Sequence, residues 1–398
     1  MRLLFTLTVA ILLTSVLSAQ TDSTNAPINM SQTILNSQKA NPLTIGLYAQ
    51  IDYNQPIDSD VRQNGKLDVH RLVTFLGYRI NKRTHFVSEI EMEHVSEVYV
   101  EQAFINYAIK PHLNIRAGLM LIPMGIVNEY HEPTTFNGVE RPNLDGKIIP
   151  STWREMGVGL YGRVDNISLR YQAYLVNGFL GYDGTARLRG SDGFRKGRQK
   201  GAESVISSPN LATKVEYYGL PGLKLGASFY TGRTQSTMYD GLLVDDEAGL
   251  ASADSSTVNM SMVAADFRYT YKGIQARGQV VYSSMKNVSA YNAFTGSDLG
   301  SAMMGYYVEL GYDLFNHRKV NPDGQKLTPF IRYEEYNTHE SVSGDMTPNA
   351  TYDRTDITAG LTFHVSPKAC FKGDYQRFSN DSDSEAQGQI NFGIGVWF

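Results

Sequence analysis

The amino-acid sequence predicts an all-β protein, a transmembrane antiparallel β-barrel of about 16 strands. Three observations predict this fold. The chain ends in an amphipathic strand, segments of about ten to thirteen residues with alternating apolar and polar side chains recur from Leu43 onward, and short connections alternate with long ones.

The last eleven residues, Gly388 to Phe398, form the amphipathic strand. Successive side chains of a strand point to opposite faces, so one face of this segment is polar or bare and the other is apolar. A terminal strand that ends on an aromatic residue resembles that of bacterial outer-membrane barrels, which assigns Phe398 to the assembly signal. A soluble β-protein can also end in such a strand. The apolar face carries Ile390, Phe392, Ile394, Val396 and Phe398.

The chain divides into three parts. Residues 1–19 carry Arg2, an apolar run and the small pair Ser18-Ala19, a pattern typical of a cleaved signal peptide. A permanent transmembrane helix would need roughly 20 apolar residues. Residues 20–41 are polar and irregular, which predicts a flexible periplasmic N-terminal segment, and residues 42–398 form the outer-membrane barrel domain.

Composition excludes several classes of protein. After the leader, no apolar run is long enough for a transmembrane helix, whereas a barrel needs an apolar residue only at every second position. Cys370 is the only cysteine, so no intrachain disulfide can form. The formal net charge is −4, which gives no reason to expect a nucleic-acid partner.

Connection lengths distinguish a barrel from a soluble sandwich, which would show the same alternation. Turns such as residues 81–83 and 272–273 are short, and the intervening connections near 123–156, 178–210, 232–259 and 284–301 are long. Bacterial barrels have short periplasmic turns and longer external loops. The predicted strands lie near residues 43–53, 67–80, 84–93, 97–109, 113–122, 157–164, 167–177, 211–218, 223–231, 260–271, 274–283, 302–314, 327–337, 355–364, 368–378 and 388–398.

About 16 strands leave a water-filled interior, so diffusion of small solutes is the expected activity. The connection from Pro123 to Met156 is about 34 residues long, more than a simple link requires. In sixteen-stranded porins the loop at this ordinal position folds into the barrel. We therefore expect a long third external loop inside the lumen.

A resemblance to one family of porins rests on two segments, Ser88–Tyr107 and Arg116–Gly162. They lie within a span of about 75 residues and resemble the phosphate-selective porin O/P family, in the form common among Bacteroidetes. The resemblance implies a passive porin in the outer membrane, a homotrimer, small hydrophilic or anionic (phosphate-like) solutes, and contact with lipid, lipopolysaccharide and the barrel assembly machinery. No cofactor and no metal are expected.

Phosphate selectivity is the part of the resemblance that this sequence supports least. Selective family members line the lumen with an arginine ladder and a lysine cluster, whereas here acidic residues such as Asp52 and Glu309 share the inferred lumen face. Interleaved signs predict a weak preference, and the charges could equally brace the wall. The candidates for the pore lining and constriction are Arg116, Glu129, Glu132, Arg141, Arg154, Glu155, Arg170, Arg268, Arg277, Arg332 and Lys372.

A basic run occupies the predicted external loop after residue 177. It could attract anions to the mouth or bridge lipopolysaccharide phosphates, and a solvated, disordered loop is the competing interpretation. Its members are Arg187, Arg189, Arg195, Lys196, Arg198 and Lys200.

The remaining motifs do not predict a cofactor, metal or catalytic site. Gly157, Gly159 and Gly162 spell GxGxxG, but no strand-to-helix context supports a dinucleotide site, and close approach on a barrel strand explains them better. His131-Glu132 lacks the second histidine of a zinc helix. The sequence has no serine elbow, so we do not expect an enzyme. The alternatives to a porin are a non-conducting barrel that serves as an adhesin or envelope anchor and an outer-membrane hydrolase.

Overall fold

The computed structural model describes residues 29–36, 41–57, 60–110, 112–382 and 386–398. The predicted signal peptide, residues 1–19, lies outside these ranges. None of the helices in the described part of the chain has the length and apolar character needed to cross a lipid bilayer.

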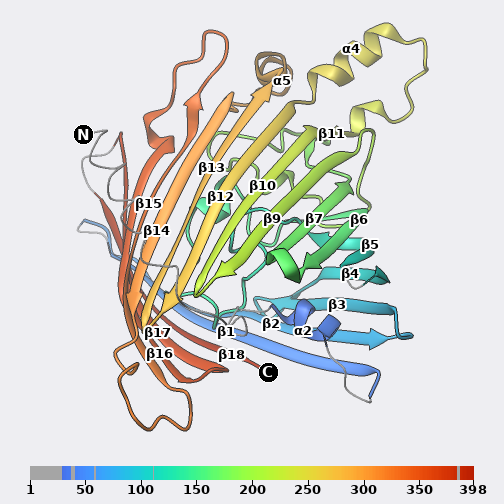
Figure 1. Ribbon diagram of the computed structural model, residues 1–398. Coiled ribbons are helices and arrows are strands. Elements are labelled where there is room, and N and C mark those ends of the chain that lie inside the picture. Colours follow the sequence, from blue (N-terminus) through green and yellow to red (C-terminus); the bar gives the residue numbers. More distant parts are fainter. Residues whose placement is uncertain (1–28, 37–40, 58–59, 111, 383–385) are drawn as a thin grey trace.

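Within these ranges, sixteen antiparallel strands form a closed barrel (Figure 1). Every predicted strand is present, which confirms the fold class. The first eight barrel strands are β1 (Leu43–Ile57), β2 (Lys66–Arg79), β3 (Thr84–Glu93), β4 (Glu97–Lys110), β5 (Leu113–Leu121), β6 (Arg154–Val164), β7 (Leu169–Val176) and β9 (Asn210–Leu220). The second eight are β10 (Leu223–Arg233), β12 (Asn259–Tyr271), β13 (Ile274–Lys286), β14 (Ala302–Tyr312), β15 (Lys326–Ser341), β16 (Asp353–Ser366), β17 (Ala369–Asn380) and β18 (Gln387–Trp397).

The first and last strands close the barrel. β1 pairs with β18 along most of its length, with Tyr53 opposite Phe392. Phe398 continues this pairing, because it exchanges two backbone hydrogen bonds of 2.8 Å with Leu47. Closure leaves no strand edge unpaired, which a barrel in a membrane requires.

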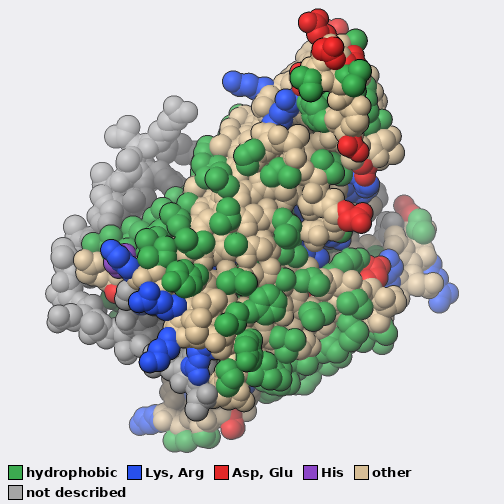
Figure 2. All heavy atoms as spheres, turned by 90° about the vertical axis from the view of Figure 1, so that its right-hand side faces the viewer, with side chains coloured by type: hydrophobic (Ala, Val, Ile, Leu, Met, Phe, Trp, Pro, Cys, Tyr) green, Lys and Arg blue, Asp and Glu red, His purple; other side chains and the backbone are tan. Residues whose placement is uncertain are grey.

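The two faces of the wall follow the alternation in the sequence. On β18, Phe392 is 58% exposed on the outer face, whereas its neighbour Asn391 is fully buried on the inner face. Figure 2 shows hydrophobic side chains spread over the barrel wall on one side of the molecule, with acidic side chains gathered on the uppermost loop. The apolar face therefore lies where lipid would contact the barrel.

Helix α2 precedes β1, and the other remaining elements lie in the connections, which are mostly short at one end of the barrel and mostly long at the other. We call these the short-turn end and the long-loop end. β8 and β11 form a separate parallel pair at the long-loop end. The elements outside the barrel wall are α2 (Met30–Asn36), α3 (Leu144–Lys147), α4 (Glu247–Ser255), α5 (Val288–Thr295), β8 (Leu180–Tyr182), β11 (Gln235–Ser236), η1 (Asp165–Ile167), η2 (Arg195–Gly197), η3 (Thr237–Tyr239) and η4 (Ala350–Tyr352).

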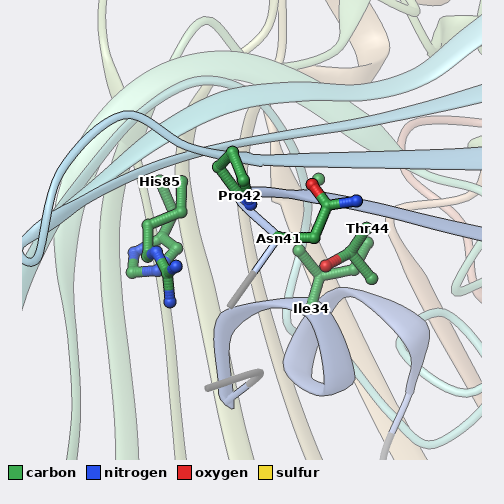
Figure 3. A pocket seen from close by; sticks show the side chains of 7 residues that line it. Ile34, Asn41, Pro42, Thr44 and His85 are labelled. Carbon is green, nitrogen blue, oxygen red and sulfur yellow. The ribbon is translucent and has the colours of Figure 1, made fainter. Parts of the chain in front are cut away.

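Helix α2 corrects the expectation that residues 20–41 are irregular throughout. It packs against β2 and β3, and Ile34 is buried beside the lumen-facing Gly77. Figure 3 shows Ile34 pointing from the helix toward Thr44 and Asn41 across a small pocket of about 10 Å³. Residues 30–36 were misjudged because Ile34, Leu35 and the hydrogen bond from Gln102 to Ser31 suffice to dock a two-turn helix onto the wall.

Candidate functional site: the lumen and its inner loop

The connection between β5 and β6, residues 122–153, lies inside the barrel and is called the lumen loop. The side chain of Asn128 closes its neck, because Asn128 Nδ2 donates to the carbonyls of Ile122 (2.7 Å) and Trp153 (2.9 Å), while Trp153 N donates to Asn128 Oδ1 (2.7 Å). Gly125 (φ +63°) and Gly138 (φ +77°) supply the left-handed turns that let the loop double back. The predicted inward fold of the long third external loop is confirmed.

Glu129 attaches the first limb of the loop to the wall. Lys214 Nζ lies 2.9 Å from Glu129 Oε2, and Gln172 Nε2 donates to Glu129 Oε1 at 2.7 Å. Lys214 also donates to the carbonyl of Gly125 at 2.5 Å. Burial raises the pKa of Glu129, but Lys214 and Arg170 outweigh it and lower the pKa to about 2. Glu129 is therefore an anchor with a fixed negative charge.

The tip of the loop reaches the opposite wall. Val139 N donates to Asp374 Oδ2 at 2.6 Å, and Asn137 Nδ2 donates to Glu309 Oε1 at 3.1 Å. Lys372 Nζ donates to the carbonyl of Phe136 at 2.9 Å. These contacts join residues more than 170 positions apart, so the loop spans the lumen from β9 to β17.

The return limb binds the wall through carboxylates. Leu144 N donates to Glu334 Oε2 (3.1 Å), and Asn143 Nδ2 donates to Asp356 Oδ2 (2.8 Å). Gln279 Nε2 donates to Asp145 Oδ1 at 2.9 Å. Burial raises the pKa of Asp145 to about 7 despite this hydrogen bond. The loop therefore carries a carboxyl group that gains or loses a proton near neutral pH.

A compact cluster holds the loop against β3 and β4. His131 Nε2 lies 3.3 Å from both Glu89 Oε1 and Glu101 Oε2, and all three side chains are buried. Burial lowers the pKa of His131, but Glu101 and Glu89 outweigh it and raise the pKa to about 10. Without another ligand, His131 is therefore a cation between two carboxylates.

The sequence-predicted pore residues lie in the lumen, where they interact with polar groups or aromatic rings. Arg116 lies over the rings of Phe104 and Tyr161 and donates to Tyr174 Oη at 3.1 Å. Arg154 lies 3.7 Å from Glu101. Arg170 and Arg268 both pair with Glu216, Arg277 pairs with Glu309, Arg332 lies between Glu309 and Glu334, Arg141 donates to the carbonyl of His131, Glu155 accepts from Trp153 Nε1, and Glu132 is buried within the loop.

The basic run is folded, which corrects the interpretation of a disordered loop. Phe194 is buried, and its backbone N donates to the carbonyl of Lys147 in the lumen loop at 3.0 Å. Arg198 bonds Thr152 Oγ1 at 3.0 Å, and Lys200 lies over the ring of Tyr99. Of the others, Arg187 pairs with Asp183, Lys196 pairs with Asp192, Arg195 donates to Ser151 Oγ of the lumen loop at 3.5 Å, and Arg189 is exposed. Part of this run covers the lumen loop, and part faces outward.

Packing leaves limited space in the lumen. Glu89, Asn391 and Glu334 on the inner wall are fully buried. A cavity of about 230 Å³ lies at the long-loop end between Asn143 of the lumen loop and the wall residues Tyr336, Asp356 and Asn380. Gly157, Gly159 and Gly162 lie on barrel strand β6, so GxGxxG here is part of the wall.

Several residues that fix the lumen loop to the wall were not predicted from the sequence. Lys214 and Asp145 were absent from the predicted set, as were Glu89 and Glu101. Lys214 and Glu129 are 85 positions apart in the sequence, so their pairing can be recognised only when the topology of the barrel is known. The alternating glutamates Glu89, Glu91 and Glu93 offered a signal, because a strand that places successive carboxylates on one inner face needs buried partners.

Comparisons with known proteins give one sequence relative and many similar folds. No protein-family model matches the chain. An uncharacterized protein of Aquifex aeolicus (strain VF5) is 31% identical over 353 residues, which cover 84% of this chain and 75% of that protein.

Solved structures of outer-membrane channels share the fold. Salmonella typhi OmpF, in a complex with daunomycin, has a TM-score of 0.57 at 12% identity and covers 90% of this chain and 98% of its own. The channel DcaP of Acinetobacter baumannii has a TM-score of 0.54 at 11% identity, with coverage of 89% and 97%. An anion-selective porin from Comamonas acidovorans has a TM-score of 0.53 at 12% identity, with coverage of 89% and 100%. At these identities the likeness establishes the barrel fold.

Proposed function

The chain belongs to the same family as the uncharacterized Aquifex aeolicus protein, and we propose that it is an outer-membrane porin through which small hydrophilic solutes diffuse passively. The observation that carries this proposal is the lumen loop, which crosses a closed sixteen-stranded barrel and is fixed to the inner wall by polar contacts. A barrel of this size is wide enough for an aqueous channel, and a loop across it sets the width of the passage.

The proposal also implies an orientation of the barrel in the outer membrane and a set of partners. The apolar outer face contacts outer-membrane lipid, the short turns face the periplasm, and the long loops face the exterior. Contact with the barrel assembly machinery during folding is part of the proposal, with Phe398, which pairs with Leu47 in the wall, as the candidate contact residue. The exposed Arg189 is available for lipopolysaccharide phosphates. Assembly as a homotrimer is part of the proposal, and a solved Vibrio cholerae OmpT of similar fold is described as a trimer form.

The proposal also concerns whether the channel prefers anions, and phosphate in particular. The resemblance to the phosphate-selective porin O/P family implies an anion preference, which needs cationic side chains free to meet the solute. Among the described residues, however, buried carboxylates outnumber buried Lys and Arg side chains about two to one. Arg170 and Arg332 are also ion-paired. We therefore propose a weak preference in place of phosphate selectivity.

Solute flux into proteoliposomes tests the proposal directly. Vesicles that contain the folded protein should swell in isotonic solutions of small neutral sugars, with a rate that falls steeply as the sugar grows. Reversal potentials in a salt gradient should stay close to zero, and added phosphate should leave the current unchanged. A large anion-selective reversal potential, together with block of the current by phosphate, would contradict weak selectivity and support a phosphate-selective porin.

A non-conducting barrel is the second candidate, and the packing of the lumen favours it. Inner-wall side chains such as Glu89 and Asn391 are fully buried, as in a protein core and not as in an open channel. An adhesin or envelope anchor would act through the long loops at one end. Vesicles that contain correctly folded protein and show no swelling with any sugar would select this candidate.

A further inference from the structure

Three side-chain atoms from different parts of the chain converge on one point in the lumen. They are Glu89 Oε1 on β3, Glu101 Oε2 on β4 and His131 Nε2 in the lumen loop, all within 4.8 Å of one another. His131 Nε2 is 3.3 Å from each carboxylate oxygen. In a tetrahedral site with metal–ligand bonds of roughly 2.0–2.2 Å, neighbouring ligand atoms are about 3.3–3.6 Å apart. The two distances from His131 Nε2 match this spacing, and the two carboxylate oxygens are close enough to approach one ion together.

Each of these side chains is held by a second residue through the atom that points away from the centre. Gln102 Nε2 donates to Glu89 Oε2 at 2.6 Å, and Arg154 Nη1 lies 3.7 Å from Glu101 Oε1. His131 Nδ1 lies 3.2 Å from the carbonyl of Asn128, which leaves Nε2 for the centre. Metal-binding histidines and carboxylates are oriented by outer partners of this kind.

Glu101 provides the independent observation that a ligand is needed. The residue is fully buried, and neither of its carboxylate oxygens has a hydrogen-bond partner in the structure. Its ion pairs to His131 and Arg154 are both longer than a hydrogen bond of ordinary length. His131 and Arg154 stabilise the charge of Glu101 through space, and a bound cation would add the direct bonds that both of its oxygens lack.

We propose that Glu89, Glu101 and His131 bind one divalent transition-metal ion, for which zinc is the closest match. One imidazole nitrogen with two carboxylate oxygens suits zinc better than calcium, which takes six to eight oxygen ligands. Because His131 belongs to the lumen loop and the two glutamates to the wall, the ion ties the loop to β3 and β4. The site does not depend on the proposed porin function.

The competing state of these atoms is a protonated His131 bridging two carboxylates. Metal and proton occupy the same nitrogen, so only one can be present at a time. Zinc binding to the folded protein distinguishes them, since an ion-paired histidine alone has no saturable affinity for zinc.

The experiment uses the full-length folded barrel in detergent, treated with EDTA and then titrated with ZnCl₂ by isothermal calorimetry. One equivalent of zinc should bind, and cobalt in its place should give a visible absorption spectrum of a site with nitrogen and oxygen ligands. Glu101→Gln should weaken zinc affinity at least tenfold, and Gln102→Ala about 10- to 100-fold. His364→Gln is the matched control, because His364 also contacts the lumen loop, through the carbonyl of Thr134.

Two results would overturn the proposal. The first is wild-type protein, with its fold verified by circular dichroism, that binds no zinc above the level of the Glu89→Gln/Glu101→Gln variant. The second is saturable zinc binding that His131→Gln leaves unchanged. If His131→Gln does not fold, the cobalt spectrum of Glu101→Gln decides, because loss of an oxygen ligand from the site must alter it.

Discussion

Lys214 of β9 and Glu129 of the lumen loop form a buried ion pair, with 2.9 Å between Lys214 Nζ and Glu129 Oε2. Lys214 Nζ also donates to the carbonyl of Gly125, so one ammonium group fixes two points on the first limb. Contacts at the tip and on the return limb complete the attachment. The docked position of the loop is therefore set by charges in the barrel wall.

Lys214→Met should loosen the first limb. Glu129 would remain buried with only Arg170, 3.9 Å away, as a counter-charge, and breaking a buried ion pair on one side costs roughly 3–5 kcal/mol. We expect a lower midpoint in urea unfolding and a larger, noisier single-channel conductance. Glu129→Gln/Lys214→Met is the control, and it should recover part of the lost stability. Equal stability of the single variant and the wild type would rule out this anchor.

The docking of the loop should depend on pH through Asp145. Its pKa in the docked loop, about 7, lies above the ordinary value of 3.8, so the docked state holds the proton more tightly. The contribution to stability is full below pH 3.8 and is lost as pH rises toward about 7. The midpoint temperature of thermal unfolding should therefore decrease as the pH rises from about 4 to about 7, and Asp145→Asn should flatten this slope. Asp240→Asn, in an exposed loop, should leave the slope as in the wild type.

Gly138→Ala should destabilise the tip of the loop. Gly138 has φ +77°, and a Cβ atom there would lie 3.3 Å from Asp374 Oδ2, the acceptor of Val139 N. Non-glycine residues in the left-handed region cost about 1 kcal/mol or more. Gly146→Ala in the same loop is the control, because a Cβ atom at that position meets nothing within 4 Å. Urea unfolding should separate the two variants, and identical midpoints would show that the tip is not strained.

Release of α2 should widen the passage at the short-turn end. The helix is held by Ile34 against Gly77 and by Gln102 Nε2, which donates to Ser31 Oγ at 3.1 Å. Ile34→Asp would bury a carboxylate in an apolar contact and should detach the helix. We expect a higher conductance than in Thr33→Asp, where the substituted side chain is exposed. Conductance equal in both variants would mean that α2 lies outside the solute path.

The barrel could be predicted from the sequence because the alternation of apolar and polar side chains along each strand involves only residues that are close in sequence. Alternation along β18, for example, assigned Phe392 outward and Asn391 inward before any contact was known. Strand ends were less accurate. β6 begins at Arg154, three residues before the predicted start, because backbone pairing with β5 continues past the apolar band.

The interior could be predicted only in outline. The length of the third loop indicated that it enters the lumen, but its partners depend on strands that are distant in sequence, as with Val139 and Asp374, which are 235 positions apart. The cluster of Glu89, Glu101 and His131 was missed for the same reason. No motif brings together residues from two strands and a loop, so only the closed barrel places them side by side.

Single-channel recording of the purified, folded protein in a planar bilayer tests whether this barrel is a porin whose passage the lumen loop narrows. We expect discrete conductance steps for the wild type and larger steps for Lys214→Met. Silence from both proteins, with their fold verified, would contradict this expectation, and so would identical steps from the two.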